Sequence, residues 1–174
     1  MSETEKLPNR KPTRLNKYDY SAPGAYFITI CTRERKQILS TITVGDGVLD
    51  VPQNILSNYG KIAEKYILQM DEFYKQISVD KYIIMPNHIH LIITIKKLNN
   101  YPINGMSGTP SPTNSVIPKF ISTLKRFCNK EYNENIWQRS YHDHIIRGEA
   151  DYRKIWEYID TNALKWEEDC FYND

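Results

Sequence analysis

The segment KYIIMPNHIHLIITI, residues 81–95, carries the strongest prediction about the fold of this chain. It consists of two apolar, β-rich runs on either side of Pro86-Asn87, and a proline cannot lie inside a central strand. The segment therefore predicts a strand, a tight turn at Pro86-Asn87, and a second strand from His88 to Ile95.

The second of these strands carries two histidines separated by one residue. Side chains two residues apart in a strand share a face, so His88 and His90 project together while Ile89 and Leu91 point to the core. Two imidazoles form half of a metal site, or a pair of donors for an oxyanion, and a third ligand must come from elsewhere. The alternative is two half-exposed histidines on a solvent face.

Strand-like and helix-like segments alternate along the rest of the chain. Strands are expected from β-branched and aromatic runs, and helices from apolar residues at three- and four-residue spacing, as between Ile55 and Met70. Asp46-Gly47 indicates a hairpin. The expected elements are a strand at 24–32, the hairpin within 38–51, a helix at 52–73, the two strands within 76–95, a helix at 117–132, a strand within 136–147 and a final helix at 149–166.

This order predicts an α+β fold with a ferredoxin-like core, in which helices pack on a central antiparallel β-sheet. We expect residues 1–20 to form a basic N-terminal arm and residues 21–174 a single domain. Residues 97–116 are rich in Pro, Gly, Ser and Asn, and are expected to form a flexible loop.

Composition limits the class of protein. The chain has 174 residues, of which 40% are hydrophobic and 25% charged, as in an ordinary globular domain. No apolar run reaches membrane-spanning length and the start MSETEKLPNR is polar, so we expect a cytoplasmic protein. Cys31, Cys128 and Cys170 have no CxxC spacing, which argues against a disulfide framework or a zinc knuckle.

The charges are unevenly distributed, although the net charge is only +2. Basic residues dominate the N-terminal arm and recur in the second half, whereas acids collect from Glu149 to Asp174. A basic body favours a polyanionic partner. Ordinary solvated surface charge is the alternative.

A second pair of histidines, His142 and His144, has the same spacing as the first. It could form a competing site or a second wall of the same site. Asp143 leaves the alternation of faces open.

The final helix has a polar stripe beside its apolar face. Tyr158 and Asn162 lie one turn apart, at the edge of the core-facing sector, so a phenol and a carboxamide are presented together. An amide oxygen is a plausible third metal ligand beside two histidines. The chain has 13 tyrosines, and Tyr158 as a boundary aromatic is the alternative.

Five segments in this order resemble a known family, and the resemblance extends from Arg14 to Lys165. The family is the single-tyrosine HUH transposases, and within it the branch of REP-associated tyrosine transposases. The segments are RLNKYDYSAPGAYFITICTRER, YIIMPNHIHLIIT, FISTLKRF, IWQRSYHDHIIR and DYRKIWEYIDTN.

The resemblance implies roles for four residues. His88 and His90 match the HUH motif, Tyr158 the nucleophile on the C-terminal helix, and Asn162 the polar third metal ligand. The family often has a proline directly after that asparagine, whereas this chain has Ala163, which leaves the end of the helix open.

The resemblance also implies the activity. A protein of this family cleaves and rejoins single-stranded DNA by metal-assisted transesterification through a 5′-phosphotyrosine, here on hairpin repeat DNA, as a monomer or a homodimer. The implied cofactor is Mg²⁺ or Mn²⁺, and structural zinc is not expected. Expected DNA contacts are basic, aromatic or histidine side chains, namely Arg14, Tyr18, Tyr20, Arg33, Arg35, Lys36, Lys125, Arg126, Arg139, His144 and Arg147.

Two other functions are compatible with the same residues. A metal-dependent hydrolytic nuclease would use the histidines and leave Tyr158 structural, without a covalent adduct. A non-catalytic nucleic-acid-binding module would need neither the histidines nor a metal.

Overall fold

A computed structural model describes residues 18–43, 51–97 and 115–172. The strands are β1 (Gly24–Cys31), β2 (Ser40–Thr43), β3 (Gln53–Leu56), β4 (Ile77–Ile84), β5 (His88–Ile95) and β6 (His142–Ile145). The helices are α1 (Asn58–Phe73), α2 (Val116–Tyr132) and α3 (Glu149–Thr161), with the 3₁₀ turns η1 (Arg33–Arg35) and η2 (Ala163–Glu168).

Four strands form one antiparallel sheet in the order β4-β5-β1-β6. Helix α1 connects β1 to β4 and α2 connects β5 to β6, so the sheet and two helices reproduce the β-α-β-β-α-β order of a ferredoxin-like unit. The predicted fold class is confirmed. Strands β2 and β3 pair as a separate two-stranded sheet, inserted between β1 and α1.

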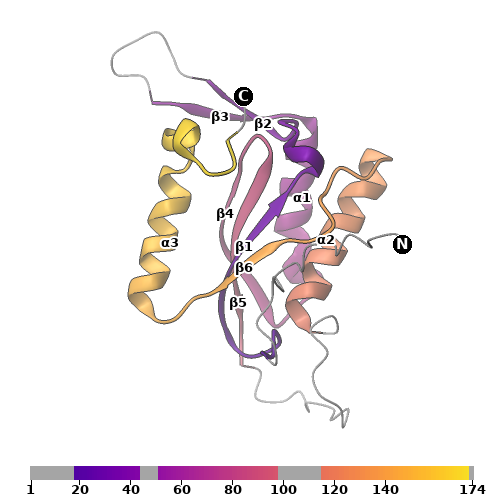
Figure 1. The fold of residues 1–174 in the computed structure, drawn as a ribbon. Helices are drawn as coiled ribbons and strands as arrows, with labels where there is room; N and C mark the ends of the chain where they lie inside the picture. The colour runs from indigo at the N-terminus through magenta and orange to yellow at the C-terminus, as the bar shows by residue number, and fades with distance from the viewer. Residues whose placement is uncertain (1–17, 44–50, 98–114, 173–174) are drawn as a thin grey trace, which may run out of the picture.

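Helices cover both faces of the four-stranded sheet (Figure 1). Helices α1 and α2 lie on one face, where apolar side chains of both helices and of the strands form the main core. Helix α3 lies on the opposite face, where Ile155 and Ile159 pack with Ile92 in a smaller apolar cluster. The two histidines of β5 belong to this second face, because Ile89 and Leu91 point into the main core.

The predicted turn between β4 and β5 is confirmed, and it is buried. Met85 N–H donates to His88 O at 2.8 Å across the turn. Two residues that follow β1 hold this turn by hydrogen bonds. Leu39 N–H donates to Pro86 O and Thr32 N–H donates to Asn87 O, both at 2.9 Å. The start of β5 is therefore anchored to the segment that follows β1.

The helix expected at 52–73 begins later than predicted. Residues Gln53–Leu56 pair with β2 as strand β3, and Ile55 is 54% exposed instead of lying on a buried helical face. Ser57 then caps α1, with its Oγ accepting a hydrogen bond from Gly60 N–H at 3.2 Å. The Asp46-Gly47 turn lies outside the described residues, as do the arm up to residue 17 and the loop 98–114.

Two further boundaries differ from the prediction. Of the strand expected within 136–147, residues His142–Ile145 pair with β1 as β6, and Trp137 forms an isolated bridge to Thr32. The final helix ends at Thr161, and the chain continues as the 3₁₀ turn η2, which is kinked at Lys165. Within the described ranges, no helix is both long and apolar enough to cross a bilayer.

Candidate active site

The histidine pair is buried beneath α3 and the C-terminal segment. His88 and His90 are 0% and 1% exposed, so the interpretation as half-exposed surface histidines is wrong. Their Nε2 atoms are 2.9 Å apart. The Nδ1 atoms make separate contacts, that of His88 to Asn87 Oδ1 at 2.8 Å and that of His90 to Thr29 Oγ1 at 2.9 Å. The two Nε2 atoms thus converge on one point.

Burial keeps both imidazoles neutral. Burial, assisted by the positive charge of Arg35, lowers the pKa of His88 to about 3. Burial, followed by the neighbouring His88, lowers the pKa of His90 well below its usual value. A neutral imidazole has a nitrogen lone pair for a metal, so the pair can act as ligands across the neutral pH range.

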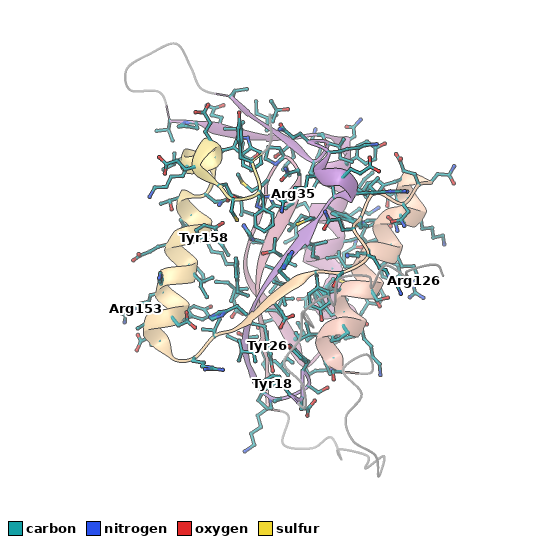
Figure 2. The ribbon with its side chains drawn as sticks, viewed as in Figure 1. Tyr18, Tyr26, Arg35, Arg126, Arg153 and Tyr158 are labelled. Carbon is teal, nitrogen blue, oxygen red and sulfur yellow. The ribbon has the colours of Figure 1, made fainter. Side chains whose placement is uncertain are left out.

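Helix α3 brings the phenol to the histidine pair and ends directly before the carboxamide. Tyr158 is carried by α3 (Figure 2). Its hydroxyl lies 3.2 Å from His90 Nε2, and the residue is 37% exposed. Asn162 is 2% exposed, directly after the last turn of α3. Both positions follow from the packing of Ile155 and Ile159 against the sheet, which orients this edge of the helix toward β5.

Asp169 joins this site, although the sequence analysis does not identify it. Its Oδ2 accepts a hydrogen bond from the Tyr158 hydroxyl at 2.9 Å and another from Asn162 Nδ2 at 2.6 Å. One potential ligand atom each of His88, His90 and Asp169 lie within 4.8 Å of one another. In the sequence Asp169 is one of several acids in an acidic end, and no spacing or periodicity distinguishes it.

A divalent metal fits these residues. The side-chain oxygen of Asn162, Oδ1, is buried and has no hydrogen-bond partner among the described residues. A buried acceptor without a partner is costly, unless a ligand such as a cation satisfies it. The amide oxygen and the carboxylate suit both Mg²⁺ and Mn²⁺, and the two imidazole nitrogens suit Mn²⁺ better than Mg²⁺, which prefers oxygen and water.

The environment of Tyr158 keeps its phenol protonated. Burial is the largest cause, and the charge and hydrogen bond of Asp169 act in the same direction, so the pKa of Tyr158 lies well above its usual value near 10. A phenol in this state is a weak nucleophile. A nearby cation would favour the phenolate and oppose this effect.

The second histidine pair lies on the same face of the sheet but does not join the cluster. His142 is paired across the strands with Thr29 and is exposed, with its ring 6.2 Å from that of Phe171. His144 Nε2 is 2.9 Å from Asp151 Oδ2 at the start of α3. In this structure His144 contacts the first turn of α3.

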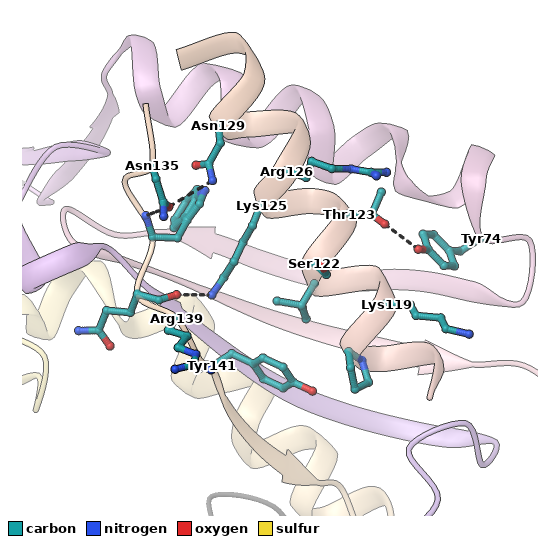
Figure 3. A pocket seen from close by; sticks show the side chains of 14 residues that line it. Tyr74, Lys119, Ser122, Thr123, Lys125, Arg126, Asn129, Asn135, Arg139 and Tyr141 are labelled. Carbon is teal, nitrogen blue, oxygen red and sulfur yellow. Dashed lines mark hydrogen bonds between the residues drawn. The ribbon is translucent and has the colours of Figure 1, made fainter. Parts of the chain in front are cut away.

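Three of the predicted DNA contacts line one groove, formed by α2 and the segment before β6 (Figure 3). The groove has a volume of about 700 Å³ and is lined by Lys125, Arg126 and Arg139, together with Lys119. The Lys125 ammonium donates to Gln138 O and to Ser140 O, both at 2.7 Å, so it also holds this segment against α2. Burial lowers the pKa of Lys125 to about 8.

The other predicted contacts are scattered. Arg33 and Lys36 are exposed on either side of Glu34, with which each makes an ion pair at 3.6 Å. Arg147 is exposed, before α3. Arg35 faces the candidate active site, where its guanidinium lies over the Phe171 ring at 4.9 Å.

The aromatic contacts differ from one another. Tyr18 is half-buried and packs edge-on against Tyr20, with ring centroids 5.1 Å apart. Tyr20 is 0% exposed, so the expectation that its ring stacks on a base is wrong. Arg14 lies outside the described residues.

The chain is similar in sequence to two bacterial proteins. No protein-family model matches the chain. It is 34% identical to an uncharacterised protein of Haemophilus influenzae, over an alignment that covers 97% of this chain and 96% of that protein. It is 25% identical to a second H. influenzae protein, provisionally named a REP-associated tyrosine transposase, over 84% of this chain and 74% of that protein.

A solved structure gives the class of fold. The structure of a REP-associated tyrosine transposase bound to a REP hairpin matches 88% of this chain and 73% of its own, with a TM-score of 0.59 and 19% identity. The fold is therefore that of a tyrosine transposase. Together with the H. influenzae protein of that name, this match confirms the resemblance to the REP-associated tyrosine transposases.

Proposed function

We propose that this protein cleaves and rejoins single-stranded DNA beside a hairpin of the REP type, through a covalent 5′-phosphotyrosine at Tyr158. The observation that carries the proposal is the contact of the Tyr158 hydroxyl with His90 Nε2 at 3.2 Å. Tyr158, the predicted nucleophile near the C-terminal end of the sequence, thus contacts the histidine pair of the same chain. This contact also supports action of the tyrosine helix in cis.

The reaction is an exchange of phosphodiester bonds. The Tyr158 oxygen attacks the scissile phosphorus, the bond from phosphorus to the 3′ oxygen breaks, and the phenol proton is lost as the 3′ oxygen gains one. The new phosphotyrosine bond is similar in energy to the bond that it replaces, so no nucleotide hydrolysis is needed. Attack by another 3′-OH reverses the step and joins two strands.

His88, His90 and Asn162 would hold the divalent metal in this reaction. When bound, the metal would polarise the scissile phosphate and offset charge on the leaving 3′ oxygen. Thr29 and Asn87 orient the two imidazoles through their Nδ1 atoms. Burial of the pair beneath α3 excludes water, which favours transfer to the tyrosine over hydrolysis.

The partner proposed for the basic surface is the DNA backbone. In the solved relative the DNA is a REP hairpin, and the α2 groove of this chain has the cationic side chains that a phosphate backbone requires. The N-terminal arm adds basic residues from the sequence. We propose that these surfaces hold the hairpin while the single strand enters the candidate active site.

A denaturing-gel assay with hairpin-bearing single-stranded DNA tests the proposal. We expect wild-type protein with Mn²⁺ or Mg²⁺ to yield a labelled adduct that survives denaturation, and Tyr158→Phe to yield none. Tyr152→Phe is the matched control, because Tyr152 lies on the same helix and its hydroxyl also donates to a carboxylate, that of Asp80 at 3.0 Å.

Two other results would reject the proposal. Cleavage without an adduct, unchanged by Tyr158→Phe, would identify a hydrolytic nuclease. Binding of the hairpin that needs no metal and survives His88→Ala, with no cleavage, would identify a non-catalytic binding module.

A further inference from the structure

The C-terminal segment 169–172 folds over the histidine pair and is fastened there by three contacts. The Phe171 ring lies 4.6 Å from that of His88. Asn87 Nδ2 donates to Phe171 O at 2.7 Å, and Arg35 Nη1 donates to Cys170 O at 3.0 Å. Asn87, which precedes β5, and Arg35, which follows β1, thus hold the segment against the site.

These contacts fix the carboxylate of Asp169. Its Oδ1 accepts a hydrogen bond from Phe171 N–H at 2.7 Å, while its Oδ2 accepts from Tyr158 and Asn162. Because the Asn162 nitrogen donates to this carboxylate, the Asn162 oxygen is the end of the amide left without a partner among the described residues. The Asp169 carboxylate therefore lies beside the two imidazoles, and the Asn162 side chain hydrogen-bonded to it has an oxygen that is free among the described residues.

Charge argues for a direct role of Asp169. Imidazoles bind a metal in the neutral form and an amide carries no charge, so without DNA His88, His90 and Asn162 would surround a dication with no anion. A dication in a buried site is strongly destabilised when its ligands are all neutral. A carboxylate oxygen is also the donor that Mg²⁺ and Mn²⁺ prefer.

We propose that Asp169 is the anionic ligand of the divalent metal at this site, beside His88, His90 and Asn162. The C-terminal segment is then part of the metal site. The proposal rests on the proposed function, because it concerns the metal of that same site.

Mn²⁺ binding to the full chain without DNA tests the assignment, with the signal of free Mn²⁺ in electron paramagnetic resonance as the readout. Asp169→Asn is expected to weaken Mn²⁺ binding by about tenfold or more, since even outer partners of metal ligands have effects of that size. Glu168→Gln, the same change at the neighbouring exposed acid, is expected to leave the affinity unchanged. Thermal unfolding in a chelator checks that each variant is folded.

A change of metal preference separates a ligand from a residue that only positions Asn162. Asp169→Cys replaces a hard oxygen by a soft thiolate, so it is expected to lower the affinity for Mn²⁺ and to raise that for Cd²⁺ relative to wild type. A residue that acts only through hydrogen bonds would give no gain for Cd²⁺, and that result would overturn the proposal.

The remaining outcomes distinguish this proposal from the proposed function. If Asp169→Asn binds Mn²⁺ like wild type while His88→Ala does not, Asp169 is not a ligand but the metal site stands. If Asp169→Asn cleaves DNA faster than wild type, the C-terminal segment obstructs the active site, and the proposal fails. If wild-type protein binds no Mn²⁺, both the ligand assignment and the metal-assisted function fail.

Discussion

The tautomers of His88 and His90 are set by single neighbouring side chains. The Asn87 nitrogen donates to Phe171 O, so its oxygen must accept from His88 Nδ1, which therefore carries the proton. The lone pair of His88 is then at Nε2, facing the candidate metal position. Thr29 Oγ1 can accept from His90 Nδ1 in the same way when the lone pair of His90 is needed at Nε2.

Of the two side chains that orient the imidazoles, Thr29 can be changed with less effect on other contacts, because Asn87 also donates to Phe171 O. We expect Thr29→Val, which replaces a hydroxyl by a methyl group, to lower Mn²⁺ affinity by about tenfold without unfolding the protein. Thr123→Val is the control, because the Thr123 hydroxyl is bonded to Tyr74 at 2.9 Å on α2, away from the site. Equal Mn²⁺ affinity of the two variants would show that Thr29 does not orient His90.

The buried histidines also make stability depend on pH. The pKa of His88 is about 3 in the folded state and about 6.5 in the unfolded state, so between these values the unfolded chain binds the additional proton. This contribution is present above about pH 6.5 and is lost as the pH falls toward 3. The free energy of unfolding should therefore fall as the pH is lowered, by at most about 1.4 kcal/mol per pH unit for this group.

Urea unfolding of metal-free protein between about pH 4 and 7 measures the effect. His88→Asn removes the titrating group, and its free energy of unfolding should depend less steeply on pH than that of wild type. Parallel curves for the two proteins would mean that His88 becomes protonated in the folded state.

At the scale of elements, α1 holds the start of β5 in place. A Cβ atom added at Gly60, in the first turn of α1, would lie 2.1 Å from Leu39 O. That oxygen also accepts hydrogen bonds from the backbone and side chain of Ser57, each at 2.9 Å. The Leu39 N–H in turn donates to Pro86 O in the turn before β5. Gly60 of α1 thus packs closely against Leu39, and Leu39 is hydrogen-bonded to the turn before the histidines.

Gly60→Ala should destabilise the protein, although alanine is the better helix former. The clash is with a backbone oxygen that cannot rotate away, and overpacking of this kind is worth about 1–3 kcal/mol, more than the gain of about 1 kcal/mol in helix propensity. Urea unfolding measures the change, with Lys61→Ala, at the next and exposed position, as the control. A Gly60→Ala variant as stable as wild type would show that α1 can shift away from Leu39.

At the scale of the whole molecule, the candidate active site and the basic groove lie on opposite sides of the sheet. Tyr158 lies on the α3 side and Arg126 on the α2 side (Figure 2). The histidine pair contacts Tyr158, and the groove is lined by Arg126. DNA that contacts both must extend around the edge of the sheet. Contacts in the groove should then affect affinity and leave the bond exchange itself unchanged.

A double variant, Arg126→Ala with Arg139→Ala, tests this separation. Each phosphate contact adds about 0.7–0.9 to the slope of log affinity against log salt, so the slope should fall by about 1.4–1.8. Adduct formation at saturating DNA should remain. Arg153→Ala is the control, since Arg153 is exposed on α3 and pairs with Glu149. An unchanged slope in the double variant would show that the groove does not bind DNA.

Much of the fold could be predicted because it depends on residue patterns within single strands and helices. Alternation in β5 places His88 and His90 on one face, and the apolar residues of α2 recur at helical spacing on the face that is buried. The beginning of α1 could not be predicted, because Ile55 fits the three- and four-residue spacing that continues to Met70. Pairing with β2, a tertiary contact, decides in favour of the strand.

Local patterns are enough to predict the α+β order, the shared face of the two histidines, and the stripe of Tyr158 and Asn162, since each depends on a period of two or of 3.6 residues. The contact of Thr29 with His90 and those of Asp169 with Tyr158 and Asn162 arise only in the folded chain. These meetings depend on strand register and on the path of the chain after α3, where η2 replaces a regular helix. No local period encodes such a path, because it is set by which surfaces of the folded core remain for the last residues to cover.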